Sequence, residues 1–248
     1  MAEFTPRHMV LVRHGESEGD VRRAARRQGT VYESRKHPLD EEQTELGNEQ
    51  TMAGGKWIAR YVLEAYGIHS FDICATSPMI RTKQSALSLG ISQTWIEDSL
   101  LTERNRGKIQ GLTRKQHQSQ YPESYVQMNT YPFHWVPPAG ESILKVADRA
   151  TKFIEQVKDY QTVLVETHRD WIWAAHIPLD GMGINEVIAV DTDEIHNAQV
   201  LHYTNVDPRD GSVHGDSLRW KRSVCPWASD VEVAEASLRW VEIDLSSS

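Results

Sequence analysis

"LVRHGESEGD", residues 11–20, marks the point where an apolar segment gives way to charged side chains. The segment before it, "HMVLV" at 8–12, is apolar and β-branched, which is typical of a strand buried in a parallel sheet. Arg13 and His14 follow directly, and the chain turns at Gly15. In open α/β sheets, ligands bind beyond the carboxyl ends of the strands. The stretch therefore predicts a guanidinium and an imidazole at a ligand-binding edge.

Strand and helix patterns alternate along the rest of the chain. This alternation predicts an α/β fold, a three-layer sandwich whose mostly parallel central sheet has helices on both faces. Ser77 suits a helix N-cap, with Pro78 at the first helical position and Gly90 as the stop. The expected strands are "FDICATSP" (71–78), "TWIE" (94–97), "TVLVETH" (162–168), "AQVLHYT" (198–204) and "SLRW" (217–220). The expected helices lie at 47–67, at 77–90 and from 141 onward, and the apolar-rich "WIWAAHI" (171–177) follows the strand at 162–168.

We expect one domain over residues 1–248. The Pro- and aromatic-rich region at about 98–140 predicts a small insertion over the active-site rim, and about 206–248 predicts a C-terminal extension. Paired Gly54 and Gly55 weaken the front half of the helix predicted at 47–67.

Composition limits the classes of function. The chain has 248 residues and a net charge of -8, which argues against nucleic acid as a partner. No run approaches the ~18 apolar residues of a membrane span, and we see no signal peptide at the N-terminus. Two cysteines, Cys74 and Cys225, are too few for a disulfide framework. We therefore expect a cytoplasmic protein that contacts neither membrane nor nucleic acid.

Four predicted strand or helix boundaries carry titratable groups. They are Arg13 with His14, the helix start from Ser77 to Arg81, Glu103, and His168. Arginine forks match phosphate oxygens, a helix N-terminus adds backbone donors, and a neutral imidazole can attack phosphorus. The combination suits a phosphate monoester. Taken singly, each residue has a structural alternative: Arg81 as a helix-surface residue, Glu103 as a solvated carboxylate, and His168 as a buried core histidine.

"LVRHGES" resembles the opening motif of the histidine phosphatase superfamily, which includes the cofactor-dependent phosphoglycerate mutases and acid phosphatases. The resemblance spans roughly residues 8–205 and continues in order through "TSPMIRTKQSA", "LLTERNRGKIQGL", "PPAGESILKVADR" and "VLVETH". It implies that His14 accepts the phosphoryl group while Arg13 and Arg81 grip its oxygens. His168 matches the second histidine of the family, which hydrogen-bonds the transferring group, and Glu103 matches the acid that protonates the leaving oxygen. Neither a metal nor a cofactor is expected.

Protonation states follow from these roles. The attacking nitrogen of His14 must be unprotonated, and we expect Arg13 and Arg81 to lower its pKa. Glu103 must keep a proton until the leaving alkoxide forms, so burial and an anionic substrate should raise its pKa.

The chain departs from the family pattern at two positions. Asp20 stands six residues after His14, where the family commonly has asparagine, and it either points elsewhere or repels a dianion. Arg169 and Asp170 follow His168 where glycine is usual. Arg169 either compensates Asp20, binds a second anionic group, or is a surface arginine at a helix start. Ser17 is a further candidate, through its hydroxyl, for the rim of the site.

The predicted function is hydrolysis of a small phosphorylated substrate through a phosphohistidine at His14. A mutase is the alternative within enzymes, because "ERNRGKIQGL" resembles the mutase version and Arg104 matches a position that binds a substrate carboxylate. Against it, mutases carry an additional basic cluster downstream, and "HQSQYPESYVQMNTYPFHW" offers no arginine there. A non-catalytic phosphate-binding protein is the alternative from another class. The substrate and the oligomeric state stay open.

Overall fold

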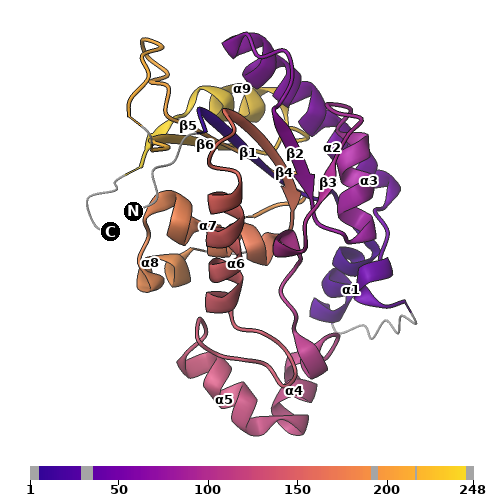
Figure 1. The fold of residues 1–248 in the computed structure, drawn as a ribbon. Helices are drawn as coiled ribbons and strands as arrows, with labels where there is room; N and C mark the ends of the chain where they lie inside the picture. Colours follow the sequence, from indigo (N-terminus) through magenta and orange to yellow (C-terminus); the bar gives the residue numbers. More distant parts are fainter. Residues whose placement is uncertain (1–5, 29–35, 191–194, 216, 244–248) are drawn as a thin grey trace.

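The computed structural model describes residues 6–28, 36–190, 195–215 and 217–243 (Figure 1). In this part of the chain, seven strands form one sheet in the order β3-β2-β4-β1-β5-β6-β7. β3, β2, β4 and β1 are parallel neighbours, and β5, β6 and β7 are added antiparallel to one another, with β5 antiparallel to β1. The strands are β1 His8–Arg13, β2 Ile73–Thr76, β3 Ile96–Glu97, β4 Thr162–Thr167, β5 Val200–Thr204, β6 Trp220–Val224 and β7 Val241–Glu242.

Helices cover both faces of the sheet, as the sequence predicts. α6 and α7 pack on the face that carries Met9 and Leu11 of β1, and α2 and α9 pack on the face that carries Val10 and Val12. The helices are α1 Glu18–Arg27, α2 Glu45–Ile58, α3 Ile80–Ser88, α4 Arg114–Gln120, α5 Pro122–Thr130, α6 Ile143–Gln156, α7 Arg169–Asp180, α8 Ile184–Ala189 and α9 Asp230–Leu238. None of these described helices is long and apolar enough to cross a membrane.

The parallel register of β1 and β4 brings two distant histidines to one edge. Arg13 is paired with Thr167, so His14 and His168 leave the sheet at the same level. In Figure 1 the strands β1, β2 and β4 point toward α4 and α5, which lie beyond this edge. Those two helices belong to the region at about 98–140 that the sequence assigns to an insertion.

The predicted N-cap of α3 is wrong. α3 begins at Ile80 and Met79 is its N-cap, so Pro78 lies before the helix. The Ser77 hydroxyl is instead 2.9 Å from Nε2 of His168. The predicted stop is confirmed, because Leu89 is the C-cap and Gly90 follows it with φ at +67°.

Gly55 does not interrupt its helix. α2 runs without a break from Glu45 to Ile58, although the sequence predicts a weakened front half. A Cβ at Gly55 would lie 1.8 Å from the carbonyl oxygen of Leu89. Glycine is therefore needed for close contact between α2 and the end of α3, and this packing outweighs its low helix propensity.

The predicted strand "SLRW" is wrong in its extent. Only Trp220 of that stretch belongs to β6, which continues to Val224. Trp220 pairs with Thr204 and Val224 with Val200, so the length of β5 determines where β6 lies. Tertiary pairing, rather than the local apolar pattern, decides the start of this strand.

Candidate active site

His14 is buried directly after β1, and its hydrogen bonds define its tautomer. Nδ1 lies 2.7 Å from the carbonyl oxygen of Gly15 and donates to it. Nε2 accepts a hydrogen bond from Nε of Arg81 at 3.2 Å. Because a neutral imidazole carries one N–H, this pattern leaves Nε2 unprotonated, with its one in-plane lone pair directed at Arg81.

Burial lowers the pKa of His14 to about 3. Asp20 opposes this shift, while Arg81 and Arg13 add to it. The sequence predicts the two arginine effects, but desolvation is the larger cause. His14 is therefore neutral at physiological pH and available as a nucleophile.

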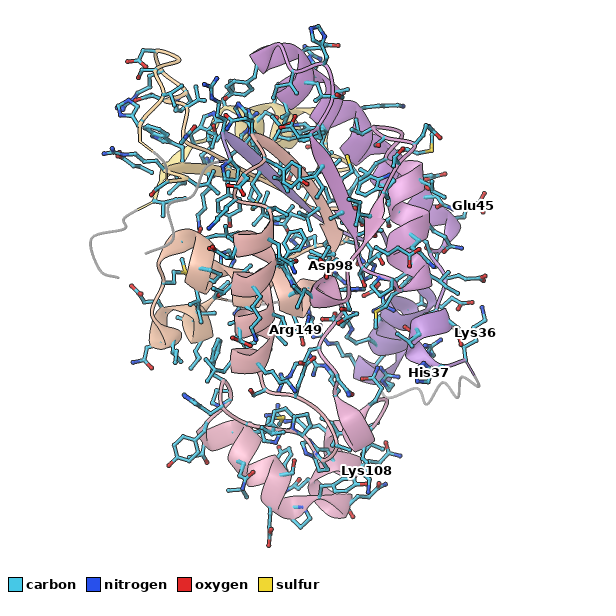
Figure 2. The ribbon with its side chains drawn as sticks, viewed as in Figure 1. Lys36, His37, Glu45, Asp98, Lys108 and Arg149 are labelled. Carbon is cyan, nitrogen blue, oxygen red and sulfur yellow. The ribbon has the colours of Figure 1, made fainter. Side chains whose placement is uncertain are left out.

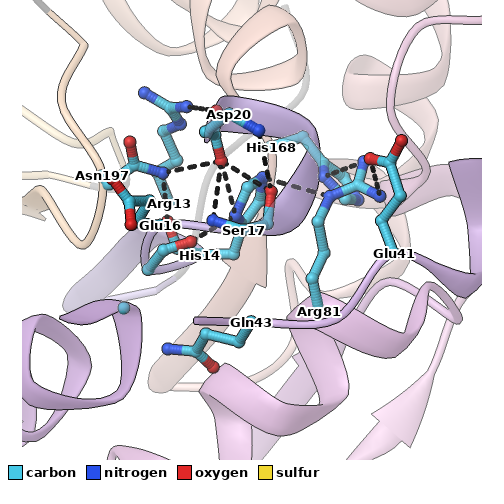
Figure 3. A network of polar contacts seen from close by, with 12 residues as sticks. Arg13, His14, Glu16, Ser17, Asp20, Glu41, Gln43, Arg81, His168 and Asn197 are labelled. Atoms are coloured by element: carbon cyan, nitrogen blue, oxygen red, sulfur yellow. Dashed lines mark hydrogen bonds and ion pairs between the residues drawn. The ribbon is translucent and has the colours of Figure 1, made fainter. Parts of the chain in front are cut away.

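The turn at Gly15 brings the backbone close to α2. A Cβ at Gly15 would lie 2.2 Å from the carbonyl oxygen of Gly47. The Gly15 N–H donates to Oγ of Ser85 at 2.9 Å, and Asn197 Nδ2 donates to the His14 carbonyl at 3.2 Å. The segment carrying His14 is thus held from α3 and from the 197 loop, as Figure 3 shows for Asn197.

His168 is the N-cap of α7 and has no solvent exposure. Its ring centre is 5.2 Å from that of His14. Nη2 of Arg81 is 3.3 Å from Nδ1, and Nε2 is 2.9 Å from Oγ of Ser77. Since arginine only donates, Nδ1 accepts and Nε2 carries the proton. Burial, with Arg81 next in size, holds the pKa of His168 well below its ordinary value.

Arg81 connects the two histidines. It is buried, and its guanidinium contacts Nε2 of His14 and Nδ1 of His168 (Figure 3). Its Nη1 is also 3.9 Å from Oε2 of Glu41. Glu41 in turn forms a salt bridge with Arg22 of α1. A phosphoryl group at Nε2 of His14 would therefore meet this guanidinium directly.

Arg13 lies on the other side of His14. Nη1 donates to the carbonyl oxygen of Ile195 at 2.6 Å, and Nη2 donates to Oδ1 of Asp20 at 2.6 Å. Its buried Nε has no hydrogen-bond partner among the described residues. Burial lowers the pKa of Arg13 to about 10, and Asp20 opposes the shift. The side chain stays cationic at neutral pH.

Asp20 and Ser17 form the capping box of α1. The Ser17 hydroxyl donates to Oδ2 of Asp20 at 2.7 Å, so it is engaged with the helix start and not with an open rim. Asp20 also accepts from Arg13, Arg23 and Asn197. Burial raises the pKa of Asp20, but Arg13, His14 and Arg23 outweigh it and hold the pKa far below its usual value.

Asp20 therefore stays ionised, and its Oδ2 lies 3.8 Å from Nδ1 of His14, on the side of the ring away from Nε2. Its charge is balanced by Arg13 and Arg23, with which it forms salt bridges. Arg169, which the sequence offers as a counter-charge for Asp20, has its Nε 3.3 Å from Oδ1 of Asp170. The sequence analysis did not single out Arg23, although its i,i+3 spacing from Asp20 places the two side chains on one face of a helix.

Glu103 is partly buried, and its Oε1 accepts a hydrogen bond from the Arg104 N–H at 2.8 Å. Burial and the neighbouring Asp170 raise the pKa of Glu103, against Arg81 and Arg169. Burial also raises the pKa of Asp170, but Arg106 and Arg169 outweigh this and lower it overall. The pKa values of the two carboxyls therefore shift in opposite directions, and Glu103 is the one that keeps its proton to higher pH.

Arg149 of α6 holds the backbone that carries Glu103. Its Nη1 donates to the carbonyl oxygens of Leu100 at 2.6 Å and Thr102 at 3.1 Å, and its Nη2 lies 3.0 Å from Oε1 of Glu141. Figure 2 labels Arg149 on α6 and Asp98, the side chain that caps the turn at 99–101. The sequence analysis missed this residue, although it ends the motif "PPAGESILKVADR".

Arg104 is buried and engaged with backbone. Nε donates to the carbonyl oxygen of Glu141 at 2.9 Å and Nη2 to that of Trp135 at 3.2 Å, and the guanidinium lies 5.0 Å from the centre of the Trp135 ring. These donors fasten the 135–141 loop. They use two of the five guanidinium N–H groups, and binding of a substrate carboxylate is the role that the mutase alternative requires of this residue.

One group of described residues has the spacing of a metal site. Asp207, Asp210 and His214 bring ligand atoms within 4.8 Å of one another in the loop before β6. Asp207 is already paired with Arg209, whose Nη2 is 2.5 Å from Oδ2. This cluster is remote in sequence from the phosphoryl site and contributes no residue to it.

A family model of the histidine phosphatase superfamily (branch 1) matches residues 9–209. The chain belongs to that superfamily. Among curated relatives, the 2,3-bisphosphoglycerate-dependent phosphoglycerate mutase of Bartonella tribocorum is 28% identical over 193 residues, covering 74% of this chain and 86% of the relative. The mutase of Rhizobium meliloti is 26% identical over 193 residues, covering 74% and 84%.

Solved structures share the fold. A mycobacterial glucosyl-3-phosphoglycerate phosphatase has a TM-score of 0.62 at 23% identity, covering 88% of this chain and 96% of that one. The alpha-ribazole phosphatase from Shigella flexneri has a TM-score of 0.61 at 18% identity, covering 85% and 96%. The superfamily members found thus include mutases and phosphatases that act on small phosphorylated molecules.

Proposed function

We propose that this protein hydrolyses small phosphomonoesters through a phosphohistidine at His14. The observation that carries the proposal is the buried, neutral imidazole whose unprotonated Nε2 faces Arg81, with His168 alongside. A nucleophile for phosphorus needs that lone pair, and the transferring oxygens need donors that carry positive charge.

In the first step, Nε2 of His14 attacks phosphorus and a nitrogen–phosphorus bond forms while the ester oxygen–phosphorus bond breaks. Glu103 gives its proton to the leaving oxygen, which departs as an alcohol. Arg13 and Arg81 bind the equatorial oxygens, whose charge is greatest in the transition state, and His168 orients Arg81 by accepting its hydrogen bond at Nδ1. The raised pKa of Glu103 supports its role as the acid.

In the second step, water attacks the phosphohistidine. Glu103, now ionised, takes a proton from that water, and the nitrogen–phosphorus bond breaks to release inorganic phosphate. Both steps return the site to its starting protonation state. Neither step requires a metal, and the residues of the site supply each proton transfer.

A phosphoglycerate-mutase-like transfer is the second candidate, favoured by the identity of 28% to a curated mutase. Arg104, the residue that a mutase would use for a substrate carboxylate, has Nε and Nη2 bonded to the backbone of Glu141 and Trp135. This contact favours the hydrolase over the mutase.

Rapid-quench labelling with a panel of ³²P-monoesters tests the proposal. A hydrolase forms an acid-labile phosphoenzyme and releases all label as inorganic phosphate. Label that moves to an added glycerate or sugar hydroxyl instead supports the mutase. Binding with no labelled protein and no turnover for any monoester would reject both and favour a phosphate-binding protein. The same panel identifies the substrate class.

A further inference from the structure

Glu41 is a buried carboxylate at the edge of the candidate active site that the proposed mechanism does not use. It follows the short 3-10 helix Pro38–Asp40 and is 7% exposed. Oε1 forms a salt bridge with Arg22 of α1, and Oε2 lies 3.9 Å from Nη1 of Arg81 on α3. Figure 3 shows this carboxylate against the guanidinium of Arg81. Glu41 therefore links α1 to the arginine that contacts both histidines of the site.

The backbone that follows Glu41 is held by both helices. The N–H of Glu18, in the first turn of α1, donates to the carbonyl oxygen of Glu42 at 2.9 Å. The N–H of Gln43 donates to Oε1 of Gln84 on α3 at 2.7 Å. Glu41 directly precedes these two anchored residues, so its backbone is fixed relative to α1 and α3.

The carboxylate of Glu41 is closely packed against the start of α1. A Cβ at Gly19 would lie 2.9 Å from Cδ of Glu41, well inside the ordinary separation of two non-bonded carbon atoms. Glycine at this position therefore leaves room for the carboxylate. Arg22, which is 8% exposed, holds the same carboxylate by its salt bridge. The side chain of Glu41 thus has little freedom to move away from Arg81.

The guanidinium of Arg81 is directed at three groups at once. Nε donates to Nε2 of His14 at 3.2 Å, Nη2 is 3.3 Å from Nδ1 of His168, and Nη1 faces Glu41 at 3.9 Å. At 3.9 Å the contact with Glu41 is an ion pair and not a hydrogen bond, and the burial of both groups limits its screening by salt. Because the guanidinium is planar and rigid, an attraction at Nη1 also determines where Nε and Nη2 point.

The neighbours of Glu41 suit its ionised form. Burial raises the pKa of Glu41, Arg22 and Arg81 oppose the shift, and Asp20 and Glu18 add to it. The two arginines that contact the carboxyl can only donate hydrogen bonds, so a proton on Glu41 would find no acceptor in either of them. The carboxylate is therefore the form that these contacts stabilise at neutral pH.

We propose that Glu41 is a positioning residue whose carboxylate, anchored by Arg22, orients the guanidinium of Arg81 toward the phosphoryl group on His14. The inference rests on the function proposed above, in which Arg81 binds the transferring oxygens. A negative charge beside Arg81 does not strengthen the attraction of a phosphate dianion in the ground state. Its benefit is instead expected in the transition state, where the oxygens need donors at fixed positions.

A double-mutant cycle on kcat tests whether Glu41 acts through Arg81. Glu41→Gln should lower kcat about tenfold with KM within about twofold, because orientation matters most in the transition state. In an Arg81→Lys background, the same substitution should change kcat less than about twofold. Glu42→Gln, which removes the exposed neighbouring carboxylate, should leave kcat unchanged. Equal effects of Glu41→Gln in the two backgrounds, or wild-type kcat in the single variant, would overturn the proposal.

Calorimetric binding of two inorganic anions separates the inference from the proposed function. Orthovanadate accepts a fifth ligand and so resembles the transferring phosphoryl group, whereas inorganic phosphate resembles the ground state. Wild-type protein should bind both anions. Glu41→Gln should weaken the binding of vanadate about tenfold and that of phosphate less than about twofold, and Glu42→Gln should change neither.

Glu41→Asp keeps a carboxylate that is one methylene shorter, so it should weaken vanadate only about threefold. This variant carries the same comparison if Glu41→Gln does not fold. Wild-type affinity for vanadate in the Glu41 variants, or equal weakening of vanadate and phosphate, would overturn the inference while the proposed function stands. Failure of wild-type protein to bind vanadate would instead reject the proposed function, and the inference with it.

Discussion

The two ends of β1 hold the same residue types in different surroundings. At its carboxyl end, His14 and His168 meet Arg81 and Arg13. At its amino end, Nδ1 of His8 is 3.1 Å from Nε2 of His202. Burial lowers the pKa of His14 to about 3 and that of His8 to about 4, so a lowered pKa does not tell the two ends apart.

The hydrogen bonds of the arginines do separate the two ends. At the amino end, Arg222 donates to the carbonyl oxygens of Ser237 and Tyr61 at 2.6 Å each and to Nδ1 of His202. Its guanidinium lies 4.8 Å from the ring centre of Trp57 and 4.3 Å from that of Trp240. This arginine fastens α9 to the sheet. At the carboxyl end, Arg13 keeps a buried Nε without a partner among the described residues, and Arg81 donates to Nε2 of His14.

Replacing one histidine at each end should give the largest contrast. His14→Ala should lower kcat at least about a thousandfold while the protein stays folded, because the nucleophile is lost. His202→Ala should lower Tm and leave kcat within about twofold. Steady-state kinetics and thermal unfolding of both variants measure the two effects. A large loss of kcat in His202→Ala would remove the functional difference between the two ends.

Glu103→Gln should come next in size. For an alkyl phosphate we expect kcat to fall about 100-fold, because the leaving alkoxide is no longer protonated. For p-nitrophenyl phosphate, whose leaving group is stable as an anion, the fall should be less than about tenfold. Since the pKa of Glu103 is raised, wild-type activity should persist to higher pH than an ordinary glutamic acid allows and then decline, and the variant should lack that decline. Equal losses on both substrates would contradict the acid role.

Arginine-to-lysine changes sharpen the comparison further. Arg13→Lys should raise KM about tenfold, because lysine lacks the planar fork that binds two oxygens. Arg222→Lys should instead lower the free energy of unfolding by about 2 kcal/mol, through its lost backbone hydrogen bonds, with KM unchanged. Initial rates and urea unfolding measure both. Unchanged KM in Arg13→Lys would place that residue outside the substrate site.

Arg104→Lys should have the smallest effect on the reaction. Its guanidinium fastens the 135–141 loop, so we expect a modest loss of Tm and KM values within about twofold for substrates with and without a carboxylate. Selective loss of affinity for the carboxylate-bearing substrate would reinstate the mutase interpretation.

The sequence predicts which edge of the sheet carries the site, because the carboxyl ends of parallel strands meet at the same edge. Apolar strands that end in Arg13, His14 and His168 must place those residues at one sheet edge once β1 and β4 pair. The α/β class and the helix layers follow from the same alternation of patterns. The termination of α3 at Gly90 follows from glycine's freedom at positive φ.

The direction of individual side chains could not be predicted in the same way. Ser77 suits an N-cap locally, yet its hydroxyl meets His168 from a strand that is remote in sequence. Asp20 and Arg104 sit in family motifs, but their partners Arg23 and Trp135 depend on helix phase and loop closure. The Asp20–Arg23 pair has a signal in its helical spacing, whereas the contacts of Ser77 and Arg104 arise only when separate segments pack and leave no mark in the local pattern.

Peptide mapping of the quenched enzyme tests the central claim most directly. The enzyme is mixed with a ³²P-monoester that it hydrolyses, and the reaction is stopped rapidly with alkali. The acid-labile label should then lie on the peptide that contains residues 11–20. It should be absent in His14→Ala and unchanged in His202→Ala. Label on another peptide, or turnover with no labelled protein at any quench time, would contradict a phosphohistidine at the carboxyl end of β1.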